Sequence, residues 1–140
     1  MSWVIYAILS AFFASLVAIF AKVGIKGVDS NLAVAVRTII IVFFAWAIVL
    51  AQGVSAQLKT WSQKTWIFIV LSAFATGLSW LFYYKALQLG EASKVAPIDK
   101  LSVALTIALA FIFLGEAPTV GNVLGGLLVV AGVLVTVFVK

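Results

Sequence analysis

The sequence predicts an all-α membrane protein with five transmembrane helices. Of its 140 residues, 66% are hydrophobic and only 9% are charged, and the mean hydropathy is +1.30. A soluble domain carries about 25% charged residues, so a single soluble core fits this composition poorly. Five apolar runs, each long enough to cross the roughly 30 Å hydrocarbon core of a bilayer, are separated by short polar or turn segments.

The composition also excludes several classes of function. The chain has no Cys and no His, which excludes a disulfide scaffold, a thiolate nucleophile and the usual Cys/His metal sites. Its formal charge is +5, but the nine basic residues sit at the ends of apolar runs and form no stripe. We therefore attribute them to membrane topology and anionic lipid, not to nucleic acid. We also expect no cofactor.

The first expected helix covers residues 3–21 and is followed by Lys22. Its start, MSWVIY, has no basic residue and the run is long enough to span, so we interpret it as a membrane helix and not as a cleaved signal peptide. The second expected helix covers residues 31–51. Its amino end is preceded or begun by three polar residues that can cap it: Asp29, Ser30 and Asn31.

Three further helices are expected, at residues 66–87, 93–114 and 120–139. Pro97 falls in the first turns of the fourth helix, where a missing amide costs little. The loops are short, so sequential helices should pack antiparallel. Residues 1–140 are thus expected to form a single five-helix domain.

The basic residues of the loops predict the orientation. Five spans place the two termini on opposite sides of the membrane, and the loop charges divide four to two: Lys22, Lys26, Lys94 and Lys140 against Lys59 and Lys64. The positive-inside rule therefore favours an outside N-terminus and a cytoplasmic C-terminus in the cytoplasmic membrane.

A few ionisable residues lie inside the apolar spans, where they are expected to face protein or water. Arg37 is six residues past the start of the second helix and Asp99 is six past the start of the fourth. With a rise of 1.5 Å per residue, both lie roughly 9 Å below the same membrane face. Lys85 returns to that face and Lys100 follows Asp99, so these four residues are predicted to form one polar cluster, with Lys22 at its rim.

Two interpretations of this cluster remain open. In one, Asp99 pairs with Lys85 or Arg37 and the remaining bases extend to the interface. In the other, the cluster lines a cavity and contacts a substrate that carries carboxylate, phosphate or zwitterionic groups. We favour the second for Arg37 and Asp99, which lie deepest. Asp99 is also the only carboxylate inside a span, which makes it the candidate for proton linkage.

Aromatic residues lie within a turn of Lys85. Trp80 shares a helix face with both Tyr83 and Tyr84, and these rings can stack on a substrate or pack against lipid. The candidate substrate-binding residues are therefore Arg37, Trp80, Tyr83, Tyr84, Lys85, Asp99 and Lys100. No catalytic or metal-binding residue is predicted.

The fifth helix is rich in glycine. Its span contains Gly121, Gly125, Gly126 and Gly132, and the first two have GxxxG spacing. Small residues allow close approach of helix backbones and favour helix association in lipid. We predict these four glycines as a dimer interface.

The run ALQLGEASKVAPIDKLSVALTIALAFIFLGE resembles the third-to-fourth-helix signature of the EamA-type drug/metabolite transporter superfamily. The matching elements are Ala86-Leu87, Gly90, Ala92-Ser93, Val95-Ala96-Pro97 and Leu114-Gly115-Glu116. Arg37 also fits the family's habit of placing an arginine in the second helix. The resemblance implies that the chain is half of a ten-helix fold, since most members carry two five-helix halves in opposite orientations.

A half-size chain implies either an antiparallel homodimer or pairing with a separately encoded half. The last helix also resembles the dimerising helix of small multidrug-resistance proteins, through Gly125, Gly126 and Gly132. Those proteins carry an essential glutamate in their first helix, whereas residues 3–21 here contain no acid. Their proton-exchange chemistry is therefore not carried over.

The resemblance implies a secondary transporter that moves a small polar or amphipathic metabolite by alternating access. The alternative is a non-transporting or obligate partner subunit of a hetero-oligomeric transporter. An enzyme acting on lipid is disfavoured, because the chain has four acids and no evident acid/base or metal constellation.

Overall fold

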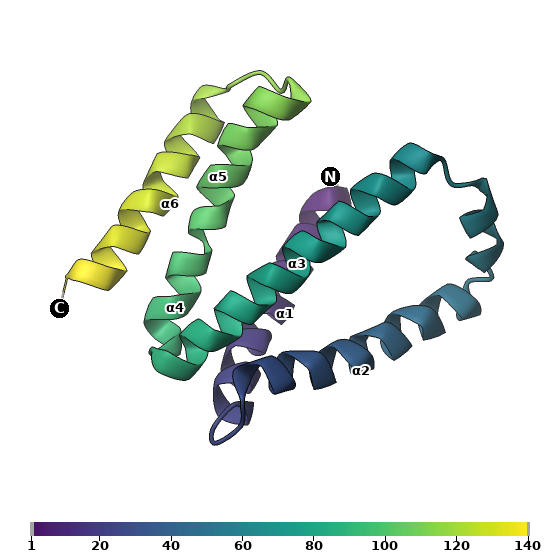
Figure 1. Cartoon of the computed structure of the whole chain (residues 1–140). Coiled ribbons are helices and arrows are strands. Elements are labelled where there is room, and N and C mark those ends of the chain that lie inside the picture. Colours follow the sequence, from purple (N-terminus) through teal and green to yellow (C-terminus); the bar gives the residue numbers. More distant parts are fainter. Residues whose placement is uncertain (1, 140) are drawn as a thin grey trace. The chain divides into compact units, whose positions relative to one another are not determined.

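The computed structural model describes residues 2–139, which form helices joined by short connections and contain no strand (Figure 1). The elements are α1 (Ser2–Gly24), α2 (Ser30–Ala51), the 3₁₀ helix η1 (Ser55–Thr60), α3 (Gln63–Leu89), α4 (Ala92–Asp99), α5 (Leu101–Leu109), the π-helical turn η2 (Ala110–Leu114) and α6 (Val120–Phe138). Lys140, which contributes to the predicted orientation, lies outside the described residues.

Within residues 2–139, five helical segments are long and apolar enough to cross a membrane: Trp3–Gly24, Ser30–Ala51, Gln63–Leu89, Ala92–Leu114 and Val120–Phe138. In each segment, at most 11% of the most apolar stretch is buried within the chain. Helices satisfy their own backbone hydrogen bonds, so apolar side chains facing outward suit a lipid environment. The predicted all-α, five-helix membrane fold is confirmed.

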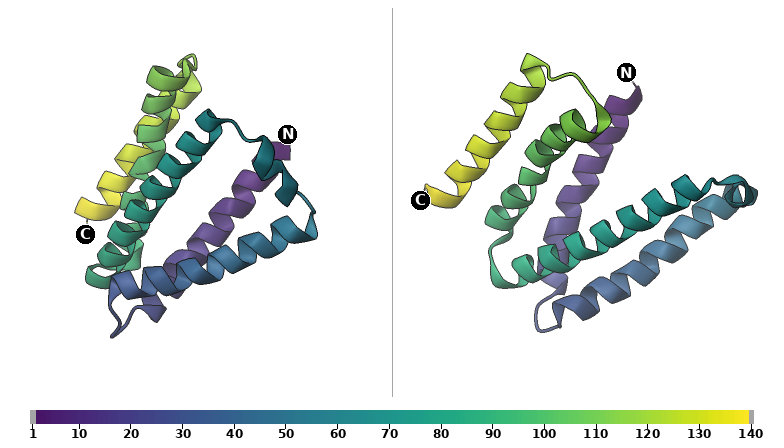
Figure 2. Two further views of the ribbon diagram at one scale, coloured as in Figure 1. Left: turned by 45° about the vertical axis from the view of Figure 1, so that its right-hand side comes forward. Right: turned by 45° about the horizontal axis from the view of Figure 1, so that its top comes forward.

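The chain divides into two compact units, one of residues 19–88 and one of residues 1–18 with 89–140. The first unit contains the end of α1 together with α2 and α3. In the second unit, α6 contacts both α4 and α5 and runs back alongside α5, as Figures 1 and 2 show.

The start of α2 is fixed by Asp29, one of the three expected capping residues. Its carboxylate Oδ1 accepts hydrogen bonds from the backbone amides of Asn31, at 2.9 Å, and Leu32, at 3.0 Å. These amides have no intrahelical acceptor, so a side-chain acceptor here stabilises the helix end. Gly27 has a φ of +74° in the preceding connection, a conformation that glycine adopts without steric cost.

The core of the unit 19–88 lies where the end of α1, the start of α2 and the end of α3 meet. Its buried residues are Ala21, Ile25, Ser30, Val34, Tyr84 and Leu87. Two hydrogen bonds attach the amino-terminal part of this unit to the last turn of α3. Gln88 Nε2 donates to the carbonyl of Val28 at 2.7 Å, and Lys22 Nζ donates to the carbonyl of Leu87. A cation at carbonyls that lack intrahelical partners is favourable for the helix end.

The fourth span is not the single continuous helix that the sequence predicts. Lys100 separates α4 from α5, and Pro97 is the sixth residue of α4, where its missing amide would have bonded to the carbonyl of Ser93. The bonds around the break are three residues long: Lys100 N to Pro97 O at 2.9 Å, and Val103 N to Lys100 O at 3.0 Å. Pro97 therefore lies beyond the first turn of α4, where a proline removes one intrahelical hydrogen bond.

Candidate functional site

The clearest candidate site is formed by Arg37 of α2 with Trp80 and Tyr84 of α3. The guanidinium carbon of Arg37 lies over both rings, 4.3 Å from the centroid of Trp80 and 5.2 Å from that of Tyr84. Both distances are within the roughly 6 Å at which a cation is attracted to an aromatic face. Residues four apart share a helix face, which explains why both rings reach one cation.

The packing of the unit 19–88 positions these three side chains. Tyr84 is 6% exposed and belongs to the buried core, and Val34, also 6% exposed, lies one turn before Arg37 on α2. Trp80 and Arg37 themselves are partly buried. Tyr84 is therefore held by the core near the start of α2 and the end of α3, and Trp80 lies about one turn before it on α3.

One nitrogen of the guanidinium has no partner. Arg37 Nη1 is buried and makes no hydrogen bond to any of residues 2–139. A buried donor without an acceptor costs about 1–3 kcal/mol, and more when it is charged. Such groups are rare in folded proteins, and an absent ligand is one physical explanation for them.

The charge around Arg37 is not neutralised within its own unit. Residues 19–88 contain six basic residues and one acidic residue, Asp29, whose carboxylate caps α2. Lys85 bonds through Nζ to the neutral Oε1 of Gln88 at 3.1 Å. The arrangement can therefore attract an anion, while the rings offer an apolar face for stacking.

Tyr83 and Lys85 are the residues on either side of Tyr84 on α3. The ring of Tyr83 meets that of Tyr84 edge to face, with centroids 6.4 Å apart, and is partly buried. Lys85 is exposed and directed to Gln88. Of the predicted site residues in this unit, the structure thus brings Arg37, Trp80 and Tyr84 together.

Asp99 and Lys100 belong to the other unit and form an ion pair with each other. Lys100 Nζ lies 3.1 Å from Asp99 Oδ2, and the two side chains are 55% and 34% exposed, respectively. One of the two interpretations from the sequence paired Asp99 with Lys85 or Arg37, whereas its partner here is the adjacent Lys100. The four-residue cluster spans two units and stays a prediction.

The glycines of α6 fall on two different faces. Gly126 is buried, and a Cβ added there would lie 3.5 Å from Ile107 Cδ1 and 4.0 Å from Ala104 Cα of α5. Gly121, Gly125 and Gly132 are exposed, and an added Cβ at Gly125 or Gly132 would meet nothing within 4 Å. Gly126 is thus used to pack α6 against α5 within the chain.

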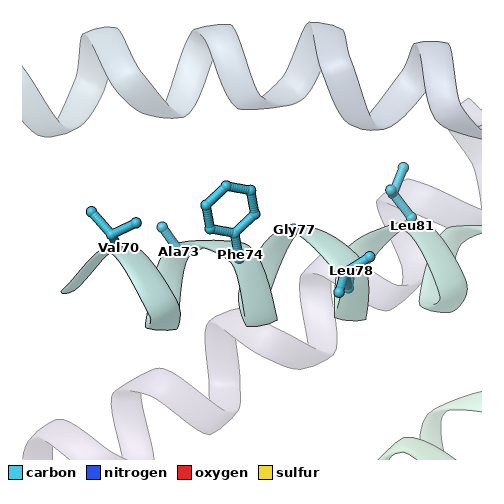
Figure 3. A pocket seen from close by; sticks show the side chains of 6 residues that line it. All are labelled: Val70, Ala73, Phe74, Gly77, Leu78 and Leu81. Atoms are coloured by element: carbon cyan, nitrogen blue, oxygen red, sulfur yellow. The ribbon is translucent and has the colours of Figure 1, made fainter. Parts of the chain in front are cut away.

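The structure also shows a shallow apolar pocket along α3, which the sequence analysis did not predict. It has a volume of about 390 Å³ and is lined by Val70, Ala73, Phe74, Gly77, Leu78 and Leu81 (Figure 3). Gly77, an isolated glycine in an apolar span, was the available signal, since the missing side chain leaves space on the helix surface. No group of three or more His, Cys, Asp or Glu side chains able to hold a metal ion is found within residues 2–139.

Five helices that are long and apolar enough to cross a membrane place the chain among polytopic membrane proteins. The EamA-like transporter family matches residues 1–138, and the chain belongs to this family. The resemblance found in the sequence is confirmed. The family is one of transporters, which points to a non-enzymatic membrane transporter that meets lipid and small-molecule substrates.

Two further proteins are similar to the chain, one over nearly its whole length and one over about half of it. A protein of Sinorhizobium, named an uncharacterized transporter in the cobO 3′ region, is 44% identical over 133 residues, which cover 95% of this chain and 94% of that protein. An uncharacterized protein of Methanocaldococcus jannaschii is 33% identical over 72 residues, covering 51% of this chain and 53% of that protein. No solved structure matches the chain.

Proposed function

We propose that the chain is a secondary transporter that moves a small polar or amphipathic metabolite across the cytoplasmic membrane by alternating access. The observation that carries this proposal is Arg37, a permanent cation inside an apolar span, stacked on Trp80 and Tyr84 with Nη1 buried and unpaired. An ionisable residue inside a span is costly in lipid and marks a substrate pathway by default. Because Nη1 is shielded here, a second conformation must expose it before a ligand can bind.

The break in the fourth span supports a role for Asp99 and Lys100 in the same pathway. Asp99 is the last residue of α4, two residues after Pro97, and Lys100 separates α4 from α5. Transporters commonly build their sites at interrupted helices, where backbone groups become available to ligands. We assign Asp99 the role of candidate proton-linked carboxylate, and Tyr83, Lys85 and Lys100 the lining of the site.

The active unit that we propose is an antiparallel homodimer of one five-helix domain, residues 1–140. The exposed face of α6 with Gly121, Gly125 and Gly132 supports it, because small residues permit close helix contact in lipid. Two halves in opposite orientations reproduce the inverted repeat of larger transporters. Gly126 is removed from the predicted interface, since its contacts are with α5. The same exposed face also fits a heteromeric partner half, which is the alternative.

Reconstitution of the purified chain in liposomes tests the proposal. Metabolite uptake is screened with and without a proton gradient, for the wild type and for the Arg37→Gln and Asp99→Asn variants. Both variants should insert normally and lose uptake, whereas Lys94→Gln, which removes only an exposed pair with Glu91, should retain it. Normal uptake by both variants would show that the charges of Arg37 and Asp99 have a structural role and are not needed for transport.

The assembly is tested with a single cysteine, because the chain has none of its own. Lys59→Cys lies in the connection between α2 and α3. In an antiparallel dimer it is labelled by an impermeant thiol reagent from both sides of the membrane. Labelling from one side of the membrane only would favour a single orientation and a separate partner half. The side labelled then also reports the orientation of the termini.

A further inference from the structure

We propose that the ligand of the Arg37 site carries an oxyanion, a carboxylate or a phosphate, held by the hydrogen-bonding edge of the guanidinium. This assignment rests on the proposed transport function, because it names the charged group of the substrate. Its structural basis is the combination of the ring contacts, the unpaired Nη1 and the charge of the unit that contains them.

The ring contacts leave the donors of Arg37 free. The guanidinium carbon lies over the rings of Trp80 and Tyr84, at 4.3 and 5.2 Å. The N–H bonds of a guanidinium point outward in its own plane, so a ring against its face occupies no donor. The rings therefore orient the cation and leave its edge for a planar acceptor. A carboxylate or phosphate matches that edge with two parallel hydrogen bonds.

The unpaired nitrogen indicates where such an acceptor is missing. Nη1 is shielded from solvent and has no partner within residues 2–139. In this poorly solvated position a charge interacts more strongly with an opposite charge than it does in water. An oxyanion would both satisfy the donor and compensate the charge, whereas a neutral acceptor would do only the first.

The charge of the unit argues against a cationic ligand. Two of its lysines, Lys22 and Lys85, have Nζ atoms bonded at the carboxyl end of α3, to Leu87 O and Gln88 Oε1. Asp29, its one acid, is engaged as the α2 cap. A cation could use Trp80 and Tyr84 only by displacing Arg37, which would leave the arginine charge without either ring or counterion. The site is therefore selective for negative charge.

The oxyanion can come from a soluble solute or from a lipid headgroup phosphate, and a binding experiment separates the two. The purified chain in lipid-free detergent is titrated with acetate, inorganic phosphate, acetamide and tetramethylammonium, and the midpoint of thermal unfolding is followed. Acetate or phosphate should raise the unfolding midpoint, and at concentrations well above its Kd the rise should follow the logarithm of the anion concentration. Acetamide and tetramethylammonium should leave the midpoint unchanged. Nanodiscs of phosphatidylglycerol or phosphatidylcholine then show whether a lipid phosphate gives the same Arg37-dependent shift.

Variants identify the residue responsible. Arg37→Gln should weaken anion binding at least tenfold, and Arg37→Lys should restore it in part, because lysine keeps the charge without the planar fork. Lys59→Gln, a base outside the site, should bind like the wild type. Equal stabilisation of the wild type by acetamide or tetramethylammonium and by acetate would overturn the assignment, as would an undiminished anion response in Arg37→Gln. If a variant fails to fold, the comparison of acetate with acetamide and tetramethylammonium on the wild type still tests the assignment.

Different experimental results would refute the transport proposal and the oxyanion proposal. Arg37-dependent anion binding without uptake of any anionic metabolite would refute transport and leave the oxyanion site standing. Uptake confined to neutral or cationic metabolites, without anion binding, would refute the oxyanion site and leave transport standing.

Discussion

Trp80→Leu is the sharpest test of the Arg37 site, because it removes the nearer aromatic face and keeps an apolar side chain on α3. Trp80 is the closer of the two rings to the guanidinium carbon, at 4.3 Å against 5.2 Å for Tyr84. Without it, Arg37 retains one weaker contact and samples more rotamers. Oxyanion binding should weaken because the guanidinium edge is no longer held in place.

The expected size follows from the environment of the contact. A cation–π contact contributes about 0.5–1 kcal/mol when exposed and about 2 kcal/mol when desolvated. Arg37 and Trp80 are both partly buried, so an intermediate loss of about 1–1.4 kcal/mol is expected. With 1.4 kcal/mol for each tenfold change, anion affinity should fall about five- to tenfold. Trp80→Phe keeps an aromatic face and should lose about threefold or less.

The assay is the anion titration, monitored through thermal unfolding. Each variant is compared by the change in unfolding midpoint that the anion causes, and not by the midpoint itself. This choice removes the general cost of deleting a large side chain. Trp46→Leu is the matched control, since Trp46 is 46% exposed and the cation–π contacts of Arg37 are with Trp80 and Tyr84. If Trp80→Leu and Trp46→Leu bind acetate and phosphate equally well, the rings do not orient Arg37 and the reasoning from the contact geometry fails.

Three further predictions concern the scaffold. Asp29→Ala should lower the free energy of unfolding by about 1 kcal/mol because two amides of α2 lose their acceptor, and an unchanged denaturation midpoint would contradict this. Gly126→Leu should lower thermal stability by crowding α5, whereas Gly125→Leu should spare the protomer and abolish crosslinked dimers; dimers that persist would exclude the proposed face. Pro97→Ala should restore an amide donor, slow hydrogen exchange at Lys100 and reduce uptake, and unaltered exchange would show that the proline does not cause the break.

The sequence predicted the helices well because length and hydropathy decide what can cross a bilayer. The second helix was expected at residues 31–51 and is found at Ser30–Ala51, and the fifth was expected at 120–139 and is found at Val120–Phe138. The third extends at both ends, to Gln63–Leu89, because polar residues can continue a helix beyond the apolar core. The error lay in the fourth, where the position of Pro97 relative to the true helix start decides whether a hydrogen bond is lost.

The sequence also selected Arg37, Trp80 and Tyr84 as candidates, but it did not pair them. It offered carboxylate partners for Arg37, and the structure shows aromatic ones. It grouped Gly125 with Gly126, and the structure buries one and exposes the other. These outcomes depend on which face of a helix meets protein.

By itself, the sequence determined that the protein lies in a membrane, the number of its spans and the family to which it belongs. Only the tertiary structure decided which side chains meet: Arg37 with Trp80, Asp99 with Lys100, Gly126 with α5. The physical reason is that lipid is as apolar as leucine, so the periodicity that marks the buried face of a soluble helix is weak in a membrane helix. The choice of face is then made by packing and by the few polar groups that lipid does not accept.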